Sequence, residues 1–204
     1  MWTNYASNHT GACLIFKTNE RQGKKNIRLR MCHSLSSGVG PIYENYLEEL
    51  HEVKYIDEFE AVNFFEMLGN VPNSLLDYWY CGEDGKESRY SFRKSIDAWR
   101  TRYWEYYQRL VTSKSKDWKE EKEARVMIRD NIFMRFSSED RKIKYEFCEL
   151  FGIVFGSRMS AENKKTVRRI VAEKCKAEKR TDFKLYEERF NRATREIELV
   201  EMRL

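Results

Sequence analysis

The stretch of residues 152–175, GIVFGSRMSAENKKTVRRIVAEKC, predicts a strand that is followed directly by a helix. Its first five residues are a short apolar run between two glycines, which is typical of a buried strand. Ser160 is a favoured N-cap residue, so we expect the helix to begin there. One face of that helix is apolar and carries Val167, Ile170, Val171 and Cys175. The segment therefore indicates a chain that packs helices on a sheet.

Further strands are predicted on both sides of this segment from short apolar or alternating runs. They cover residues 11–17, 26–32, 53–56, 124–128, 131–136 and 143–147. Residues 183–190 and 195–202 resemble a terminal hairpin with a turn at Asn191, although their charge density also allows a helix. The Ser- and Gly-rich residues 34–41 are expected to form a loop.

Two more helices are predicted from apolar side chains at helical spacing. The first covers residues 59–68, with Asp57 as a possible cap and Gly69 as its end. The second begins near Ser91 and has a continuous stripe of Phe92, Ile96, Trp99, Tyr103, Tyr106 and Leu110. This stripe could stack on bases, but core packing is the more common role. Residues 73–80 are ambiguous, and residues 81–88 form a turn or loop. The prediction is an α+β fold of one domain, residues 1–204, with a largely antiparallel sheet packed against amphipathic helices.

The composition predicts a folded protein, and we expect neither a transmembrane helix nor a secretory signal. The 204 residues include 41% hydrophobic and 14% aromatic residues, which argues against disorder. A net charge of +5 permits an anionic partner without requiring one. The five cysteines include no CxxC pair, so we expect reduced thiols and no metal site. These features predict a soluble, cytoplasmic protein.

Three segments together resemble a bacterial family. Residues 1–16, MWTNYASNHTGACLIF, resemble its Met-Trp, Tyr-Ala, His and Gly motif. Residues 114–128, KSKDWKEEKEARVMI, and residues 152–167, GIVFGSRMSAENKKTV, are similar to its second and third motifs. The chain resembles the domain-of-unknown-function family 2971 over essentially its whole length, with a diffuse middle at residues 34–110. The resemblance also implies a front segment before the first motif, which is absent here and which another chain could supply.

Glu121, Glu123 and Arg125 are spaced by two, so on a strand they would share one face. Glu-x-Glu on a strand resembles the carboxylate pair of ADP-ribosyltransferases, which cleave the nicotinamide–ribose bond of NAD. That resemblance implies a catalytic Glu123, a Glu121 that orients the acceptor and an Arg125 that holds a phosphate. The ordinary alternative is a solvated turn or a set of ion pairs at a strand edge, which contributes little to stability.

Other candidate site residues lie in the first motif and on the helix after Ser160. His9 and Tyr5 could bind substrate, although His9 could equally fix a turn and Tyr5 could pack. Residues 156–158 could bind an anion at the helix N-terminus, but ordinary capping is more common. Lys164, Lys165, Arg168 and Arg169 lie on a basic helix face that could bind nucleic acid.

Three functions are therefore compatible with the sequence. The chain could be an effector of bacterial conflict or phage defence that uses NAD as an ADP-ribosyltransferase does. It could be a nucleic-acid-binding module. It could also be a non-catalytic interaction subunit, in which strand 11–17 lies at an exposed sheet edge and pairs with a protein partner or a second copy.

Overall fold

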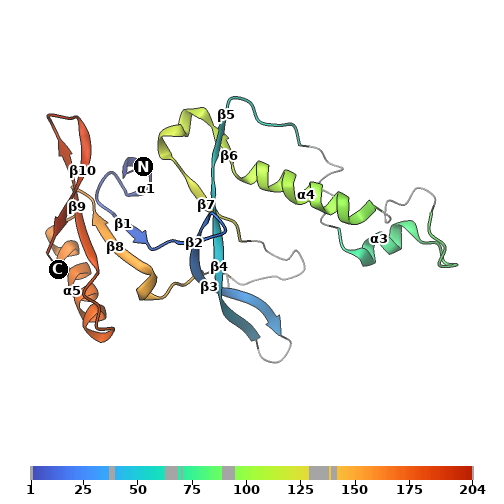
Figure 1. Ribbon diagram of the computed structural model, residues 1–204, viewed down its shortest axis with the longest axis horizontal. Helices are drawn as coiled ribbons and strands as arrows, with labels where there is room; N and C mark the ends of the chain where they lie inside the picture. The colour runs from blue at the N-terminus through green and yellow to red at the C-terminus, as the bar shows by residue number, and fades with distance from the viewer. Residues whose placement is uncertain are drawn as a thin grey trace. The chain divides into compact units, whose positions relative to one another are not determined.

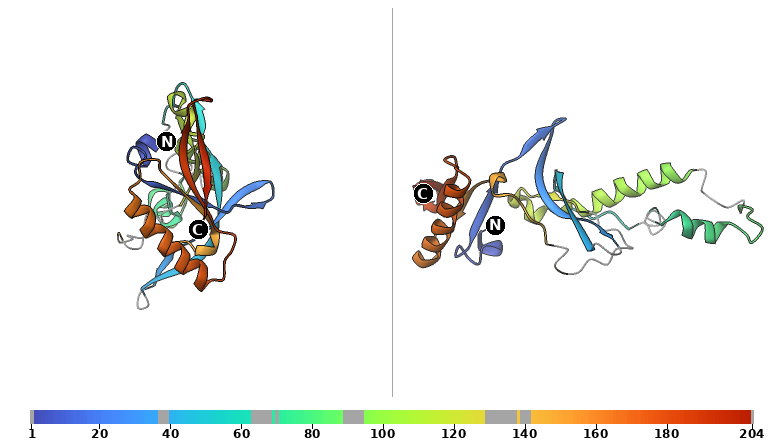
Figure 2. Two further views of the ribbon diagram at one scale, coloured as in Figure 1. Left: turned by 90° about the vertical axis from the view of Figure 1, so that its left-hand side faces the viewer. Right: turned by 90° about the horizontal axis from the view of Figure 1, so that it is seen from below.

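The computed structural model describes residues 2–36, 40–62, 69, 71–88, 95–128, 138 and 142–203 (Figures 1 and 2). Within it the chain divides into two compact units. The first unit combines Met1–Leu50 with Val126–Leu204, and the second unit is His51–Arg125. The single domain expected from the sequence stays a prediction.

A four-stranded sheet forms the centre of the first unit. Its order is β1 (Ala12–Phe16), β8 (Leu150–Phe155), β9 (Lys184–Asn191) and β10 (Glu196–Met202). The pairs β1–β8 and β9–β10 are antiparallel, whereas β8 and β9 are parallel. A parallel pair needs a crossover connection, and α5 (Ala161–Ala177) provides it. The strand–helix segment, strand 11–17 and the terminal hairpin are thus confirmed.

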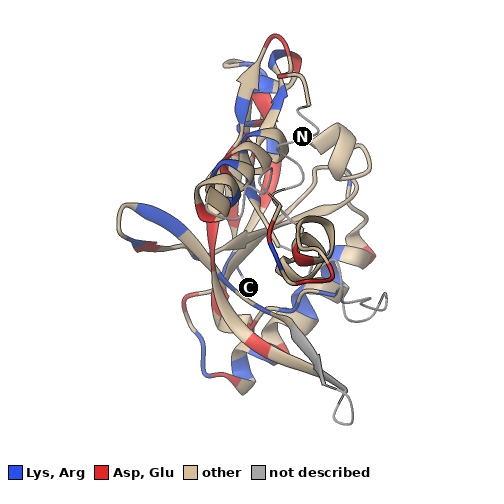
Figure 3. Cartoon of the chain, turned by 90° about the vertical axis from the view of Figure 1, so that its right-hand side faces the viewer, with Lys and Arg blue, Asp and Glu red and all other residues tan. Residues whose placement is uncertain are grey.

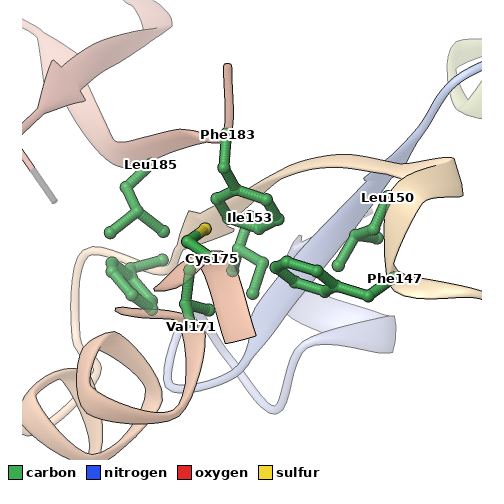
Figure 4. Packing of buried hydrophobic residues seen from close by; sticks show 8 residues of the cluster. Phe147, Leu150, Ile153, Val171, Cys175, Phe183 and Leu185 are labelled. Atoms are coloured by element: carbon green, nitrogen blue, oxygen red, sulfur yellow. The ribbon is translucent and has the colours of Figure 1, made fainter. Parts of the chain in front are cut away.

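The helix α5 packs beside the β9–β10 hairpin (Figures 1 and 2) because its apolar face is buried against one face of the sheet. Ser160 caps it as predicted, since the Ser160 hydroxyl accepts the Asn163 N–H at 3.2 Å. Figure 4 shows the resulting core, which consists of Phe147, Leu150, Ile153, Phe155, Val171, Cys175, Phe183 and Leu185. The Phe147 and Phe183 rings stack with their centroids 5.1 Å apart.

The first unit also contains a long antiparallel ladder. β2 (Asn19–Arg21) pairs with β3 (Lys24–Ser36), which pairs with β4 (Gly40–Glu52). The predicted loop at residues 34–41 is therefore too long, because both strands run into it. The strand β4 was not predicted, since the acidic stretch YENYLEEL has low strand propensity and pairing with β3 overrides it. Residue 144 forms only an isolated bridge to Arg30, and the short 3₁₀ helix η4 (Phe147–Glu149) follows, so a strand at 143–147 is wrong.

The described part of the second unit consists of helices and short strands. β5 (Lys54–Ile56) is parallel to β6 (Ser113–Ser115), which follows α4 (Ile96–Val111). The helix α3 (Asn73–Tyr80) occupies the ambiguous stretch. After β6 come the 3₁₀ helix η3 (Lys116–Glu121) and the short strand β7 (Ala124–Val126). In the predicted aromatic stripe Tyr103 and Tyr106 are buried, and the other described members are half-buried.

The helix predicted over residues 59–68 is wrong for residues 59–62, which form no helix. Asp57 does not cap a helix there, because it forms an ion pair with Lys116. The Ala61 carbonyl instead accepts the Tyr106 hydroxyl at 2.9 Å, which ties this irregular segment to α4. Residues 63–68, the start predicted near Ser91 with Phe92, and the strand 131–136 lie outside the described residues. The α+β fold and the mostly antiparallel pairing are confirmed, and no helix among the described residues is long and apolar enough to cross a membrane.

Candidate functional site

The predicted triplet of Glu121, Glu123 and Arg125 does come together, but not on one strand. Glu121 ends η3, and Lys122 adopts a left-handed conformation with φ of 46° before the chain reaches β7. What gathers the carboxylates is Lys114 of β6, a residue that the sequence analysis did not single out. Its ammonium forms an ion pair with Glu121 and lies 3.1 Å from Oε2 of Glu123.

Arg125 completes this charged cluster, which we define as Lys114, Glu121, Glu123 and Arg125. Its Nη2 donates to Oε2 of Glu123 at 3.1 Å, and its Nη1 donates to the carbonyl of Val111 at the end of α4. The backbone of Glu123 is also fixed, because its N–H donates to the Tyr55 hydroxyl at 2.8 Å. The cluster therefore joins β5, the end of α4 and β7 within the second unit.

The electrostatics of the charged cluster favour full ionisation. Hydrogen bonding to Arg125, followed by hydrogen bonding to Lys114, lowers the pKa of Glu123 to about 2. Hydrogen bonding to Glu121 and Glu123 raises the pKa of Lys114 above its ordinary value. Such a carboxylate stays negative at neutral pH, but two cations already neutralise it. This is the arrangement of a structural ion-pair set.

One atom of the charged cluster does not fit that structural role. The Glu121 side chain is only 10% exposed, and its Oε1 is buried with no hydrogen-bond partner among the described residues. Buried carboxylate oxygens normally accept a hydrogen bond, because leaving one unpaired costs free energy. This oxygen of Glu121 can therefore accept one further hydrogen bond.

His9 forms a second polar site, in the first unit. Its Nδ1 lies 2.8 and 2.9 Å from the two carboxylate oxygens of Glu188 on β9. The Glu188 side chain is 2% exposed and also accepts the Ser157 N–H at 3.2 Å. The Trp2 ring stacks on the imidazole with 6.3 Å between centroids. The first motif, the turn that precedes α5 and the strand β9 thus meet at His9.

The backbone around His9 is in an uncommon conformation. Ser7, Asn8 and His9 have φ values of 48°, 54° and 69°, which is the left-handed region. The turn is held by the Arg158 N–H, which donates to the His9 carbonyl at 2.9 Å, and by the close approach of Gly156. Residues kept in such regions each cost about 1–3 kcal/mol and cluster at functional sites.

Sequence reasoning missed Glu188, although one signal was available. Successive residues on a strand point to opposite faces, so the adjacent Glu187 and Glu188 cannot share a face. Glu187 pairs with Lys164 on the α5 side, with Nζ–Oε1 at 2.7 Å. Glu188 must therefore point to the other face, where only a partner such as His9 makes its burial tolerable.

The remaining predicted site residues are less well supported. Tyr5, in the short helix α1 (Trp2–Tyr5), is 67% exposed, so it does not pack as expected. On the basic face of α5, Lys164 pairs with Glu187, Arg168 donates to the Arg203 carbonyl, and Arg169 pairs with Glu173. Lys165 is exposed. The helix α5 also carries the acidic Glu162 and Glu173, so its charge is not of one sign, and both signs of charge are visible along the ribbon in Figure 3.

Residues 156–158 act as part of the protein's own hydrogen-bonding framework. The N–H groups of Gly156, Ser157 and Arg158 donate to Gly11, Glu188 and His9, respectively. These donors are thus occupied, and an anion site there finds no support. Within the described ranges, no group of three or more His, Cys, Asp or Glu side chains could hold a metal ion.

Comparison with known proteins gives a family but no activity. Residues 1–126 match the family model described as "Protein of unknown function (DUF2971)". That range includes His9 and the whole charged cluster, and it ends before β8, α5 and Glu188. No curated protein and no solved structure matches the chain. Because the match covers more than half of its length, the chain belongs to the DUF2971 family.

Proposed function

We propose that this chain is an enzyme of group transfer or hydrolysis in which His9 is the acid–base residue and Glu188 orients it. The observation that carries the proposal is the contact of His9 Nδ1 with both oxygens of a buried carboxylate. An ionised carboxylate can only accept hydrogen bonds, so Nδ1 carries the proton. The lone pair of the neutral ring is then on Nε2, where it can take a proton from an attacking hydroxyl or water.

Exposure supports the same division of roles. Glu188 is almost completely buried, while the His9 side chain is 25% exposed, which leaves its ring accessible to a substrate. No side-chain partner of Nε2 occurs among the described residues. A buried carboxylate that fixes the tautomer of a partly exposed histidine is the arrangement that acid–base sites use.

The competing explanation is that the pair only pins the turn before β1. Two substitutions at one position separate the two roles. His9→Asn keeps a donor near the place of Nδ1 and tolerates the left-handed backbone, but it has no group equivalent to Nε2. If the pair is only structural, His9→Asn should behave as the wild type. If His9 is catalytic, His9→Asn should fold normally and lose activity by about 10²–10⁴-fold.

The experiment expresses the full chain, His9→Asn and Glu188→Gln in a bacterial host. His51→Gln is the matched control, because His51 lies in the second unit, where its Nδ1 contacts Gln108. Growth and NAD level are followed together, and purified proteins are tested for nicotinamide release from NAD. We expect the wild type and His51→Gln to be equally active, and His9→Asn and Glu188→Gln to be inactive. A well-folded His9→Asn variant with wild-type activity would reject the proposal.

The use of NAD by the charged cluster, as in ADP-ribosyltransferases, is a second candidate function. One observation favours it: the buried Oε1 of Glu121 has no hydrogen-bond partner among the described residues, and a ribose hydroxyl is the kind of donor that would fill this position. The Glu123 carboxylate could stabilise an oxocarbenium-like centre only if a substrate drew Arg125 or Lys114 away from it. This second candidate is therefore the weaker one.

Matched glutamine variants test the second candidate. Glu121→Gln and Glu123→Gln are compared with Glu120→Gln, which changes an exposed neighbour on η3. NAD cleavage that disappears in the first two variants and persists in the third would support glycosidic chemistry at the charged cluster. NAD cleavage retained by all three would assign the charged cluster to structure alone.

We extend the proposal to a cytoplasmic effector of conflict or phage defence, and the growth assay in the bacterial host tests that setting at the same time.

A further inference from the structure

We propose that the first unit contains a binding pocket for a small aliphatic molecule with one anionic head group. The pocket lies between the sheet and α5, on the face of the sheet opposite His9 and Glu188. Its volume is about 320 Å³, which falls at the lower end of the range of ligand pockets, about 300–1,000 Å³. It is independent of the acid–base site and of the charged cluster.

The floor of the pocket is the core of the first unit. Phe147, Leu150, Ile153 and Val171 line it, and each is less than 9% exposed (Figure 4). They come from η4, β8 and α5, the elements that the crossover connection holds together. The floor is thus formed by well-packed side chains, and it offers a ligand only apolar contacts.

The rim consists of apolar side chains that the fold leaves in solvent. Leu14, Tyr145 and Ile170 line the pocket and are 41%, 41% and 42% exposed. Tyr145 is held in place, because its ring packs edge-on against Phe16 with 4.9 Å between centroids. Exposed apolar residues that surround a concave apolar floor favour burial of an apolar ligand, since the rim would be covered as well.

Lys174 determines the sign of the head group. Among the described residues that line the pocket it alone is charged, and its Nζ lies 5.7 Å from the centroid of the Phe147 ring. No carboxylate forms an ion pair with Lys174 in the described part of the chain. The other cation at this ring, Arg180, is not among the residues that line the pocket. Its Nε donates to Asp182 and its Nη1 to the carbonyls of Phe147 and Leu150. An exposed ammonium beside an apolar pocket is complementary to the carboxylate of an alkanoate.

Isothermal titration calorimetry with sodium decanoate, 1-decanol and decylamine, each below its micellar concentration, tests the proposal on the full chain. We expect decanoate to bind best and decylamine worst. Because one buried methylene contributes about 0.8 kcal/mol, octanoate should bind about fifteenfold more weakly than decanoate. Lys174→Gln should weaken the binding of decanoate about fivefold, because one partly exposed ion pair contributes about that much, and should leave the affinity for decanol unchanged.

Two further variants control for charge and for shape. Lys165→Gln removes a cation from the same helix outside the pocket and should leave all three affinities unchanged. Val167→Phe fills the pocket and should abolish binding of decanoate and decanol together. If that variant does not fold, Leu14→Trp at the exposed rim replaces it. No saturable binding of decanoate by the wild type, preference for decylamine, or binding only to anionic phosphatidylglycerol vesicles would overturn the proposal.

Discussion

Gly156 is the position at which a single methyl group should disturb the candidate acid–base site without touching its side chains. A Cβ at Gly156 would lie 2.1 Å from the carbonyl oxygen of His9 and 2.9 Å from that of Gly11. Both neighbours are backbone atoms, so no flexible side chain can move aside. Because ordinary contacts begin at about 3.4 Å, Gly156→Ala requires the His9 turn to withdraw by more than about 1 Å.

The magnitude follows from the contacts that this withdrawal breaks. Overpacking of this kind costs about 1–3 kcal/mol. Two hydrogen bonds are stretched as well, Gly156 N–H to Gly11 and Arg158 N–H to His9, both 2.9 Å long. Each contributes about 0.5–1.5 kcal/mol. We therefore expect the turn of residues 6–11 to become easier to open by about 3 kcal/mol, which is about a hundredfold in its opening equilibrium.

Hydrogen exchange followed by mass spectrometry measures this opening directly. Peptides that cover residues 2–16 should exchange about a hundredfold faster in Gly156→Ala, and peptides of the second unit should be unchanged. Gly82→Ala is the matched control, because a Cβ there meets only the end of the Asp84 side chain, at 2.9 Å. Exchange of the His9 turn within threefold of the wild type would refute the reasoning and show that the turn does not depend on this close approach.

Three further predictions concern stability and assembly. Tyr106→Ala should lower the free energy of unfolding of the second unit by about 3–5 kcal/mol, and Tyr106→Phe by about 1 kcal/mol through the lost bond to Ala61, as measured by urea titration. The pKa of Glu123 in the folded chain, about 2, is below its ordinary value of 4.5. The stabilisation that ionised Glu123 gives the fold is therefore complete above pH 4.5 and is lost as the pH falls toward 2. The free energy of unfolding of Glu123→Gln should therefore depend less on pH between about 2 and 4.5 than that of the wild type. The same pH dependence in both proteins would contradict the ion-pair geometry. Because β1 ends the order of the described sheet, we expect a dimer or a complex through that edge, and a monomer by light scattering at high concentration would count against it.

The fold could be predicted where one face of an element is buried. The strand β8 is almost entirely apolar, and the helix α5 has apolar residues at helical spacing. The strand β4 lacks this signal, since Ile42 and Leu47 are more than a third exposed and most of its other residues are polar. Its conformation depends on the ladder with β3, and a local pattern does not contain that information.

The candidate sites show the same division between local and tertiary information. Glu121, Glu123 and His9 stand out in the sequence because they belong to family motifs. Their partners are harder to pick out, because Lys114 is one of several lysines at the start of the second motif and Glu188 is one of two adjacent glutamates outside the quoted motifs. Which of these common charged residues becomes a buried partner is decided by the pairing of β5 with β6 and of β8 with β9.

The family match and the structure divide the chain differently, and the difference bears on the acid–base site. The match ends at Val126, yet β1 in the matched part pairs with β8, and His9 binds Glu188 of β9. The core of the first unit is formed by residues 147–185, which also lie after the match. The matched segment thus provides the histidine, and the segment after it provides both the strand that supports β1 and the carboxylate that orients the ring. It follows that the His9 motif acquires the geometry of an acid–base group only in the context of the C-terminal strands and α5.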